Sequence, residues 1–149
     1  MKNVFNAADY QDIVRRIEAL TPGATRQWGK MTPAQAMEHC ARGLDLVLGP
    51  QPLKQMFLGK LIGWMVRGKF VGPDPFQKNA PTGPTLVVKD DPNFSASVAR
   101  ATERLAAFHS LGSDAANGRV HLFFGPLSGE EWGVTQYKHF DHHLRQFGA

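Results

Sequence analysis

The chain has 149 residues, of which 42% are hydrophobic and 20% are charged, and its formal net charge is +4. This length predicts one domain, residues 1–149, and the composition excludes a wholly disordered chain because it supplies enough apolar side chains for a core. The single cysteine, Cys40, excludes an internal disulfide framework, and the N-terminus has no continuous apolar run of the kind that a secretory signal needs. We therefore expect a cytoplasmic protein.

The first two predicted helices have clear start and stop signals. Asn6 is the expected N-cap of the first helix, which ends at residues 21–23 (Thr-Pro-Gly). Thr32 is the expected N-cap of the second helix, where Gln35 stands at capping-box spacing, and this helix is predicted to run to about Leu48. The apolar stripe of the first helix consists of Tyr10, Ile13, Val14, Ile17 and Leu20.

A long crossover, residues 50–92, is predicted to separate the second helix from the third. Its first part, 53–67, is predicted to be helical with lysines among its apolar positions, and its second part is a proline-rich loop. Residues 85–88 form the only predicted strand. The charges of the helical part are not separated from its apolar side chains, and no nucleic-acid-binding module is present, so we expect neither membrane nor nucleic acid as a partner. A segment that covers the bundle or forms a homodimer contact is favoured instead.

Two further helices complete the predicted fold. The third begins near Asn93 or Ser95 and stops before Gly112. The fourth opens with Ser128 and Glu131, a capping-box pair, and is expected to run through Phe147. Four helices joined by one long helix-plus-loop crossover predict an all-α four-helix bundle, a fold that builds metal sites between facing helices.

The histidines are the strongest functional signal. His139 and His143 are four residues apart, so in a helix they offer their rings to one point on the apolar face, where an unsatisfied imidazole would be costly. The opposite face is expected to carry Lys138, Asp141 and Arg145. The chain contains six histidines: His39, His109, His121, His139, His142 and His143.

His39 lies within the apolar arc of the second predicted helix and supplies a candidate third ligand. Three inward histidines from two helices would form an open metal site of the kind that catalytic zinc uses. The same residues also fit hydrogen-bonded core histidines or a pocket without metal, and His109 is the rival third ligand. The residue after His139 is Phe140 rather than the glutamate of zinc peptidases, which disfavours a peptidase.

Four other residues are candidates for the pocket, each with a simpler structural role. Gln136 lies one turn before His139 on the same face and is suited to hold a bound water or substrate. His121 lines the pocket or is a solvated loop residue. Trp132 is a cavity wall or a core residue. Cys40 is a soft ligand or a small apolar core residue.

Several motifs carry a resemblance to a known group of proteins. His39 followed by Cys40 in the second helix, with His139 and His143 in the last, resembles the DinB/YfiT-like metalloenzyme superfamily. The closer resemblance, over essentially the whole chain, is to a branch described only as a domain of unknown function. The segments of this chain that resemble the motifs of that branch are residues 28–31, 37–40, 78–82, 124–128, 131–133, 136–139 and 141–148.

The resemblance implies an up-down-down-up bundle, often dimeric, with a divalent metal on His39, His139 and His143. Zinc, nickel and iron all suit three imidazoles. Relatives include thiol-dependent transferases and an isomerase, in which the metal activates a low-molecular-weight thiol. The 78–82 loop belongs to the closer branch alone, so the relatives' substrates do not carry over. We expect a metal-dependent transferase or hydrolase acting on a small-molecule substrate. The alternative is a non-catalytic metal- or ligand-binding protein with a stress-related role.

Overall fold

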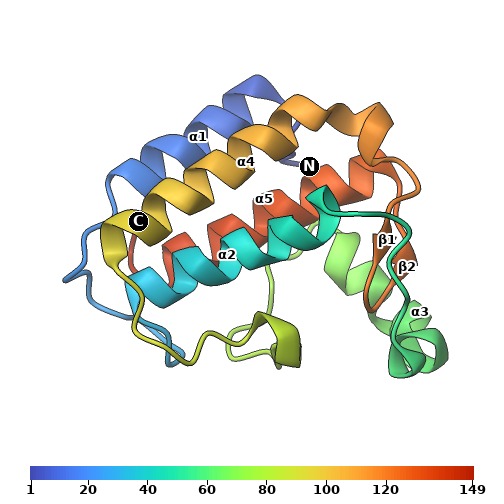
Figure 1. Cartoon of the computed structure of the whole chain (residues 1–149), viewed down its shortest axis with the longest axis horizontal. Coiled ribbons are helices and arrows are strands. Elements are labelled where there is room, and N and C mark those ends of the chain that lie inside the picture. Colours follow the sequence, from blue (N-terminus) through green and yellow to red (C-terminus); the bar gives the residue numbers. More distant parts are fainter.

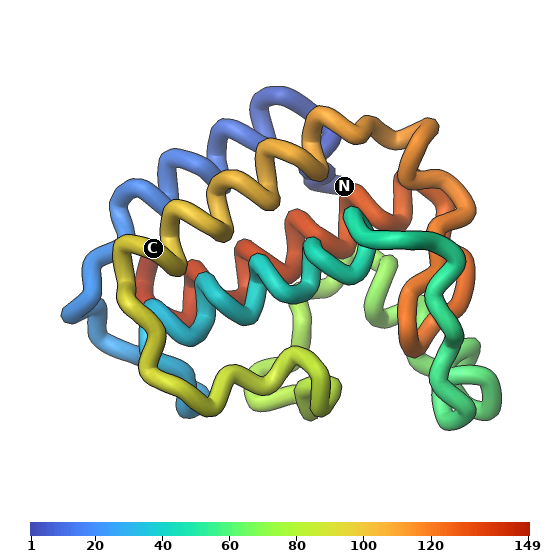
Figure 2. Tube along the Cα trace, viewed as in Figure 1, coloured from blue at the N-terminus to red at the C-terminus, as the bar shows by residue number.

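The computed structural model describes all 149 residues and is mostly helical (Figure 1). Helices α1, α2, α4 and α5 lie side by side, with α1 and α5 running in one direction and α2 and α4 in the other (Figures 1 and 2). Helix α3 stands apart at one end, beside a two-stranded hairpin. The helices are α1 (Ala7–Glu18), α2 (Pro33–Leu48), α3 (Phe57–Val71), α4 (Phe94–Ala116) and α5 (Gly129–Arg145); the strands are β1 (Val120–His121) and β2 (Gly125–Pro126).

The predicted helix starts are confirmed by their side-chain caps. The Asn6 side chain accepts hydrogen bonds from the first turn of α1. Thr32 with Gln35, and Ser128 with Glu131, each form a complete capping box at the start of α2 and α5. These caps satisfy backbone donors that a helix leaves unpaired.

One apolar core joins the four side-by-side helices. Its 20 buried residues form a single cluster that includes Ile13 of α1, Leu44 of α2, Leu105 of α4 and Phe140 of α5, none of which is more than 1% exposed. The amphipathic stripes predicted from the sequence therefore face one another. Helix α5 lies against α1, α2 and α4 and so carries its inward side chains into the middle of the molecule.

The predicted strand at residues 85–88 is wrong. Residues Pro84–Leu86 form a 3-10 helix, and the carbonyl of Leu86 bonds a histidine ring rather than a neighbouring strand. The strands lie instead in the β1–β2 hairpin, whose register pairs Val120 with Pro126 and His121 with Gly125. Two-residue strands carry too little alternation to be recognised from sequence.

Helix boundaries also differ from prediction. Gly112, with a positive φ of 78°, breaks the helix at the predicted position, and a second short helical segment extends α4 to Ala116. Helix α5 ends at Arg145 rather than Phe147, and α3 begins and ends four residues later than expected.

The prediction that Lys138 lies on the exposed face of the last helix is wrong. Lys138 is 8% exposed, and its ammonium donates hydrogen bonds to the carbonyl oxygens of Lys69, Phe70 and Gly72 at 2.8–3.1 Å. These carbonyls lie at the C-terminal end of α3, where a helix lacks internal partners and favours positive charge. A side chain that the wheel places outward thus holds α3 against α5.

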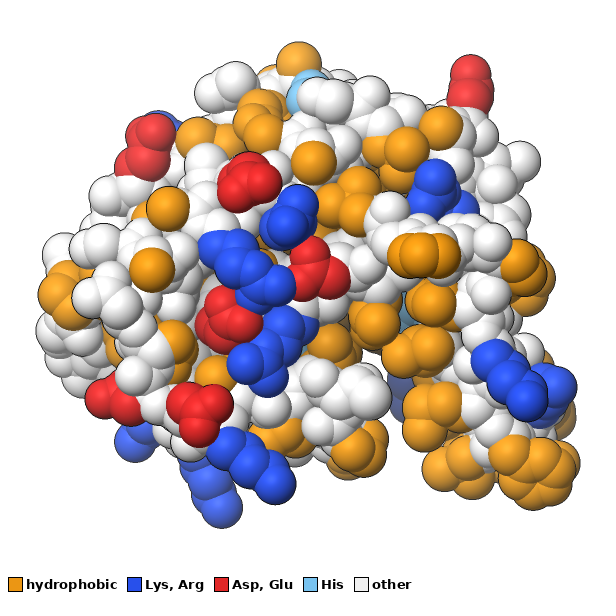
Figure 3. All heavy atoms as spheres, in the orientation of Figure 1, with side chains coloured by type: hydrophobic (Ala, Val, Ile, Leu, Met, Phe, Trp, Pro, Cys, Tyr) orange, Lys and Arg blue, Asp and Glu red, His pale blue; other side chains and the backbone are white.

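The apolar side of α3 faces outward. Gly59 and Gly63 contact the backbone of the hairpin, and a Cβ on Gly59 would lie 2.1 Å from the Phe123 oxygen, so the approach requires glycine. Phe57 and Trp64 on the other side are 76% and 75% exposed. Figure 3 shows hydrophobic side chains gathered at this end of the molecule. None of the helices has both the length and the apolar character that crossing a bilayer requires.

Candidate metal centre

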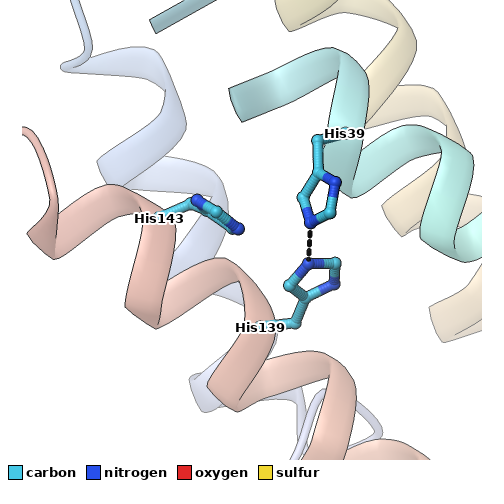
Figure 4. Close-up of side chains that lie close together, drawn as sticks. All are labelled: His39, His139 and His143. Carbon is cyan, nitrogen blue, oxygen red and sulfur yellow. Dashed lines mark hydrogen bonds between the residues drawn. The ribbon is translucent and has the colours of Figure 1, made fainter. Parts of the chain in front are cut away.

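Three histidine rings converge between α2 and α5. Nε2 of His39 lies 2.8 Å from Nε2 of His139, and the ring of His143, one turn further along α5, lies 4.8 Å from the His39 ring (Figure 4). One ring nitrogen from each histidine lies within 4.8 Å of the other two. The predicted i, i+4 pair and the predicted partner on the second helix are therefore brought together in one buried cluster.

Hydrogen bonds orient two of the three rings. Nδ1 of His39 lies 2.9 Å from the carbonyl oxygen of Leu86. Nδ1 of His143 lies 3.0 Å from Oε1 of Gln146, whose Nε2 donates to the carbonyl of Trp28 at 2.8 Å. Because these oxygens only accept, each Nδ1 carries the proton, and each Nε2 presents a lone pair of the kind that a cation requires. The lone pair on Nε2 of His39 is directed at Nε2 of His139, 2.8 Å away.

Burial keeps the cluster uncharged. His39 and His143 are only 5% and 7% exposed. Desolvation lowers the pKa of all three histidines, that of His143 to about 3. The pKa of His139 lies well below its usual value, mainly because burial disfavours the charged ring. Repulsion between a charged His139 and the neighbouring histidines lowers this pKa further. Neutral imidazole is the form that binds metals.

Helix α2 leaves room for the His139 ring at one position. A Cβ at Gly43 would lie 3.1 Å from Cε1 and 3.4 Å from Nδ1 of His139, closer than most side-chain contacts. The glycine in α2 therefore allows the His139 ring to lie close to the helix that supplies His39.

The donor set fits a divalent cation. Tetrahedral zinc with ligands at about 2.0–2.1 Å holds its nitrogens about 3.3 Å apart. The spacing of the three histidines brackets this value, from 2.8 Å up to the limit of 4.8 Å. Three neutral imidazoles would leave one coordination position for water or substrate, and ligand type alone does not select the metal.

A family model described as "Protein of unknown function (DUF1569)" matches residues 2–149. The chain belongs to the DUF1569 family. No curated protein and no solved structure matches it significantly.

In this DUF1569 protein the rival ligand, His109, lies outside the cluster. Its Nδ1 lies 2.7 Å from the carbonyl of Val4, and its ring stacks on Tyr10. His109 thus joins the N-terminal segment to α4, which is a structural role.

Three of the predicted pocket residues have structural partners. Cys40 is fully buried in the core, and burial raises its thiol pKa. The indole of Trp132 donates to the Arg119 carbonyl at 3.0 Å. Nδ1 of His121 accepts from the backbone of Phe123 and Phe124 and so shapes the hairpin. Cys40 and Trp132 therefore lie in the core, whereas His121 is not the solvated loop residue of the simpler interpretation, because its ring packs against Phe124 and Trp132.

Gln136 differs from those three. It is 4% exposed, and its Oε1 has no hydrogen-bond partner in the protein, although a buried amide oxygen normally has one. It lies one turn before His139 on α5. Its contact with a bound water or substrate stays a prediction.

Sequence reasoning missed Gln146 and the Leu86 carbonyl. Gln146 stands three residues after His143, a spacing that brings helix side chains together. This spacing was a signal from which its contact with His143 could have been predicted. The Leu86 contact depends on the path of a proline-rich loop and leaves no periodic signal.

Proposed function

We propose that His39, His139 and His143 hold one divalent cation (zinc, nickel or iron) and that this DUF1569 protein is a metal-dependent enzyme. Its expected reaction is a transfer or a hydrolysis on a small molecule. The observation that carries the proposal is the convergence of three neutral imidazoles, two of which have Nδ1 fixed by a hydrogen bond.

The cation would supply Lewis acidity, because three neutral ligands leave its charge in place and lower the pKa of a water or thiol at the open position. The protein's part is orientation. Leu86 and Gln146 fix two rings, and the unpartnered oxygen of Gln136 is available to accept a hydrogen bond from the reacting molecule. A low-molecular-weight thiol as co-substrate would give transfer, and water would give hydrolysis.

The proposal includes a DinB/YfiT-like up-down-down-up bundle. It is supported by the opposite directions of α1 and α5 relative to α2 and α4 (Figure 1), and by ligands from the second and last of these four helices. The helix-plus-loop crossover between α2 and α4 is consistent with the same topology.

One observation favours a non-catalytic alternative. His39 and His139 already bond one another at 2.8 Å, so that pair is satisfied without a cation. In that case the cluster would serve stability or bind a ligand, in a protein with a stress-related role.

A metal titration separates the two functions. We would measure metal content by mass spectrometry and thermal unfolding with added Zn²⁺, Ni²⁺ and Fe²⁺ for the native protein, His139→Ala and His143→Ala. His109→Gln is the matched control, since that histidine lies outside the cluster. We expect about one metal per chain, lost in both alanine variants only. Unchanged metal content in those variants would disprove the site.

The enzymatic part is tested on the metal-loaded protein with labile electrophiles. Transfer requires turnover that depends on an added low-molecular-weight thiol, and hydrolysis requires turnover without one. Metal-dependent stabilisation with no turnover under either condition would favour the non-catalytic alternative.

We also propose that two copies of the chain pair through α3. The outer face of α3 is a stripe of large apolar side chains, each at least 40% exposed, and lysines flank it: Met56, Phe57, Leu58, Leu61, Ile62, Trp64, Met65 and Val66, with Lys60 and Lys69. An apolar centre with a charged rim is typical of protein interfaces, which bury about 800 Å² per partner. Monomers rarely expose so many adjacent apolar side chains.

A further inference from the structure

A small pocket lies between the proline-rich loop and the last turn of α5. Its lining is rich in aromatic rings and cations and contains no acidic residue: Trp28, Pro75, Phe76, Lys78, His142 and Arg145. The cavity has a volume of about 60 Å³, which admits one small polar group and excludes a whole cofactor.

The two cations of this pocket are weakly paired. Lys78 has no carboxylate within 4.0 Å, and its ammonium lies 4.3 Å from the centre of the Trp28 ring. Arg145 reaches Asp141 only at 3.6 Å, and the other oxygen of that carboxylate is held by Arg16 at 2.8 Å. Both cations therefore retain hydrogen-bond donors for an incoming anion.

The pocket adjoins the histidine cluster. The ring of His142, in its wall, lies 5.1 Å from the ring of His143. The ring of Phe76, also in its wall, lies 6.5 Å from that of His139. The backbone of Trp28 receives the hydrogen bond of Gln146, the residue that orients His143. One layer of side chains thus separates the cations from the candidate ligands.

We propose that Lys78 and Arg145 bind a carboxylate or phosphate group of the substrate, which then extends past Phe76 to the histidine cluster. This deepens the proposed function by naming the substrate class: a small molecule with an anionic end and a reactive centre a few bonds away. A guanidinium matches the two oxygens of such a group, and an ammonium adds a point charge. Phe76 and Trp28 supply apolar walls for the carbon atoms between the two ends.

The anion site is tested first on metal-free protein. Propionate and inorganic phosphate are titrated and followed by amide chemical shifts, with 1-propanol as the uncharged probe. We expect saturable binding of an anion at residues 75–78 and 142–145 and none of propanol. Lys78→Gln and Arg145→Gln should each weaken binding about tenfold, as loss of a charged hydrogen bond predicts. Lys89→Gln, an exposed lysine of the same loop, should leave it unchanged.

Anion binding that is absent, or equal in all three variants, would overturn the proposal. The measurement needs no metal, so it succeeds or fails separately from the metal titration.

The link to the cluster is tested on the Co²⁺-loaded protein. 3-Mercaptopropionate is compared with 3-mercaptopropan-1-ol, which has the same chain but no charge, by the change in the cobalt absorption spectrum. The anionic thiol should bind about tenfold more tightly, and Lys78→Gln should remove this preference while leaving cobalt content intact. Equal affinities would show that the pocket does not serve the cluster.

Discussion

Nε2 of His39 and Nε2 of His139 lie 2.8 Å apart, although 100 residues separate them in the chain. The contact exists because α2 and α5 each present a histidine from a buried face, and because Gly43 allows the helices to approach around the His139 ring. A polar contact at this depth is costly unless its groups are fully paired. The Leu86 carbonyl and Oε1 of Gln146 accept hydrogen bonds from Nδ1 of His39 and Nδ1 of His143 and complete the pairing of these outer nitrogens.

Gln146→Met should weaken metal binding without unfolding the protein. Methionine keeps the length of the side chain, but the His143 ring loses the acceptor that fixes its tautomer and orientation. Loss of such a supporting contact typically reduces metal affinity 10- to 100-fold. The measurement is a competition titration of Zn²⁺ against a chromophoric chelator, with Gln27→Met, an exposed glutamine, as the control. Equal affinities for the two variants would show that Gln146 does not position His143.

Gly43→Ala should displace the His139 ring and lower metal affinity about tenfold. The new methyl group would lie 3.1 Å from Cε1 of His139, so the ring must move. Alanine favours a helix interior over glycine by about 1 kcal/mol, which offsets the cost to folding. We therefore expect a metal defect with little loss of stability, measured by chelator competition and urea unfolding. Gly68→Ala on α3, where nothing lies within 4 Å, should change neither metal affinity nor the ring position.

The sequence predicted those parts of the site that follow a regular spacing. The i, i+4 pair of His139 and His143 and the inward position of His39 depend on helical periodicity, and they are found together. The capping residues Thr32 and Ser128 were recognisable because a cap is a local hydrogen bond. These features need no knowledge of distant parts of the chain.

The remaining features depend on tertiary contacts. Lys138 lies on the polar side of the helical wheel, yet the end of α3 packs over it and supplies three carbonyl partners. Residues 85–88 have strand-forming side chains, but no strand lies beside them, and His39 binds the Leu86 carbonyl instead. In both cases a contact far away in the sequence outweighs local preference.

The stability of the metal-free protein should fall as the pH is lowered from about 7 to about 4. Burial lowers the pKa of His121 to about 4 from 6.5 in the unfolded chain. Between these values the unfolded state binds a proton that the folded state does not, so acid favours unfolding, by up to about 1.4 kcal/mol per pH unit for this residue. The buried cluster histidines act in the same direction.

His121→Asn isolates this contribution. The asparagine oxygen is able to accept the hydrogen bonds that Nδ1 accepts from Phe123 and Phe124, but it does not titrate. Urea unfolding at pH 7.5 and 5.0 should give a smaller loss of stability for the variant than for the native protein. Identical losses would mean that His121 is protonated equally in the folded and unfolded states.

Lys138→Met should loosen α3 while leaving the rest of the helices in place. The change removes the donor to three carbonyls at the end of α3, and unsatisfied buried groups cost about 1–3 kcal/mol. The ion pair of Arg67 with Glu131 at 2.7 Å still attaches α3 to α5, so the defect should be local. Hydrogen exchange should accelerate in α3 but not in α2 or α5. Lys60→Met, on the exposed side of α3, is the control.

The proposed pairing through α3 predicts that Leu61→Lys makes the protein monomeric. Leu61 is 54% exposed near the middle of the outer face of α3, and an isologous interface would bring this new charge into an apolar contact twice. Light scattering at micromolar concentrations should give twice the chain mass for the native protein and the chain mass for the variant. Val87→Lys, which adds the same charge at an exposed apolar residue outside α3, should remain dimeric. A monomeric native protein would contradict the pairing. In that case, binding to anionic lipid vesicles that changes in Leu61→Lys but not in Val87→Lys would assign the same face to a lipid surface, which the flanking lysines suit.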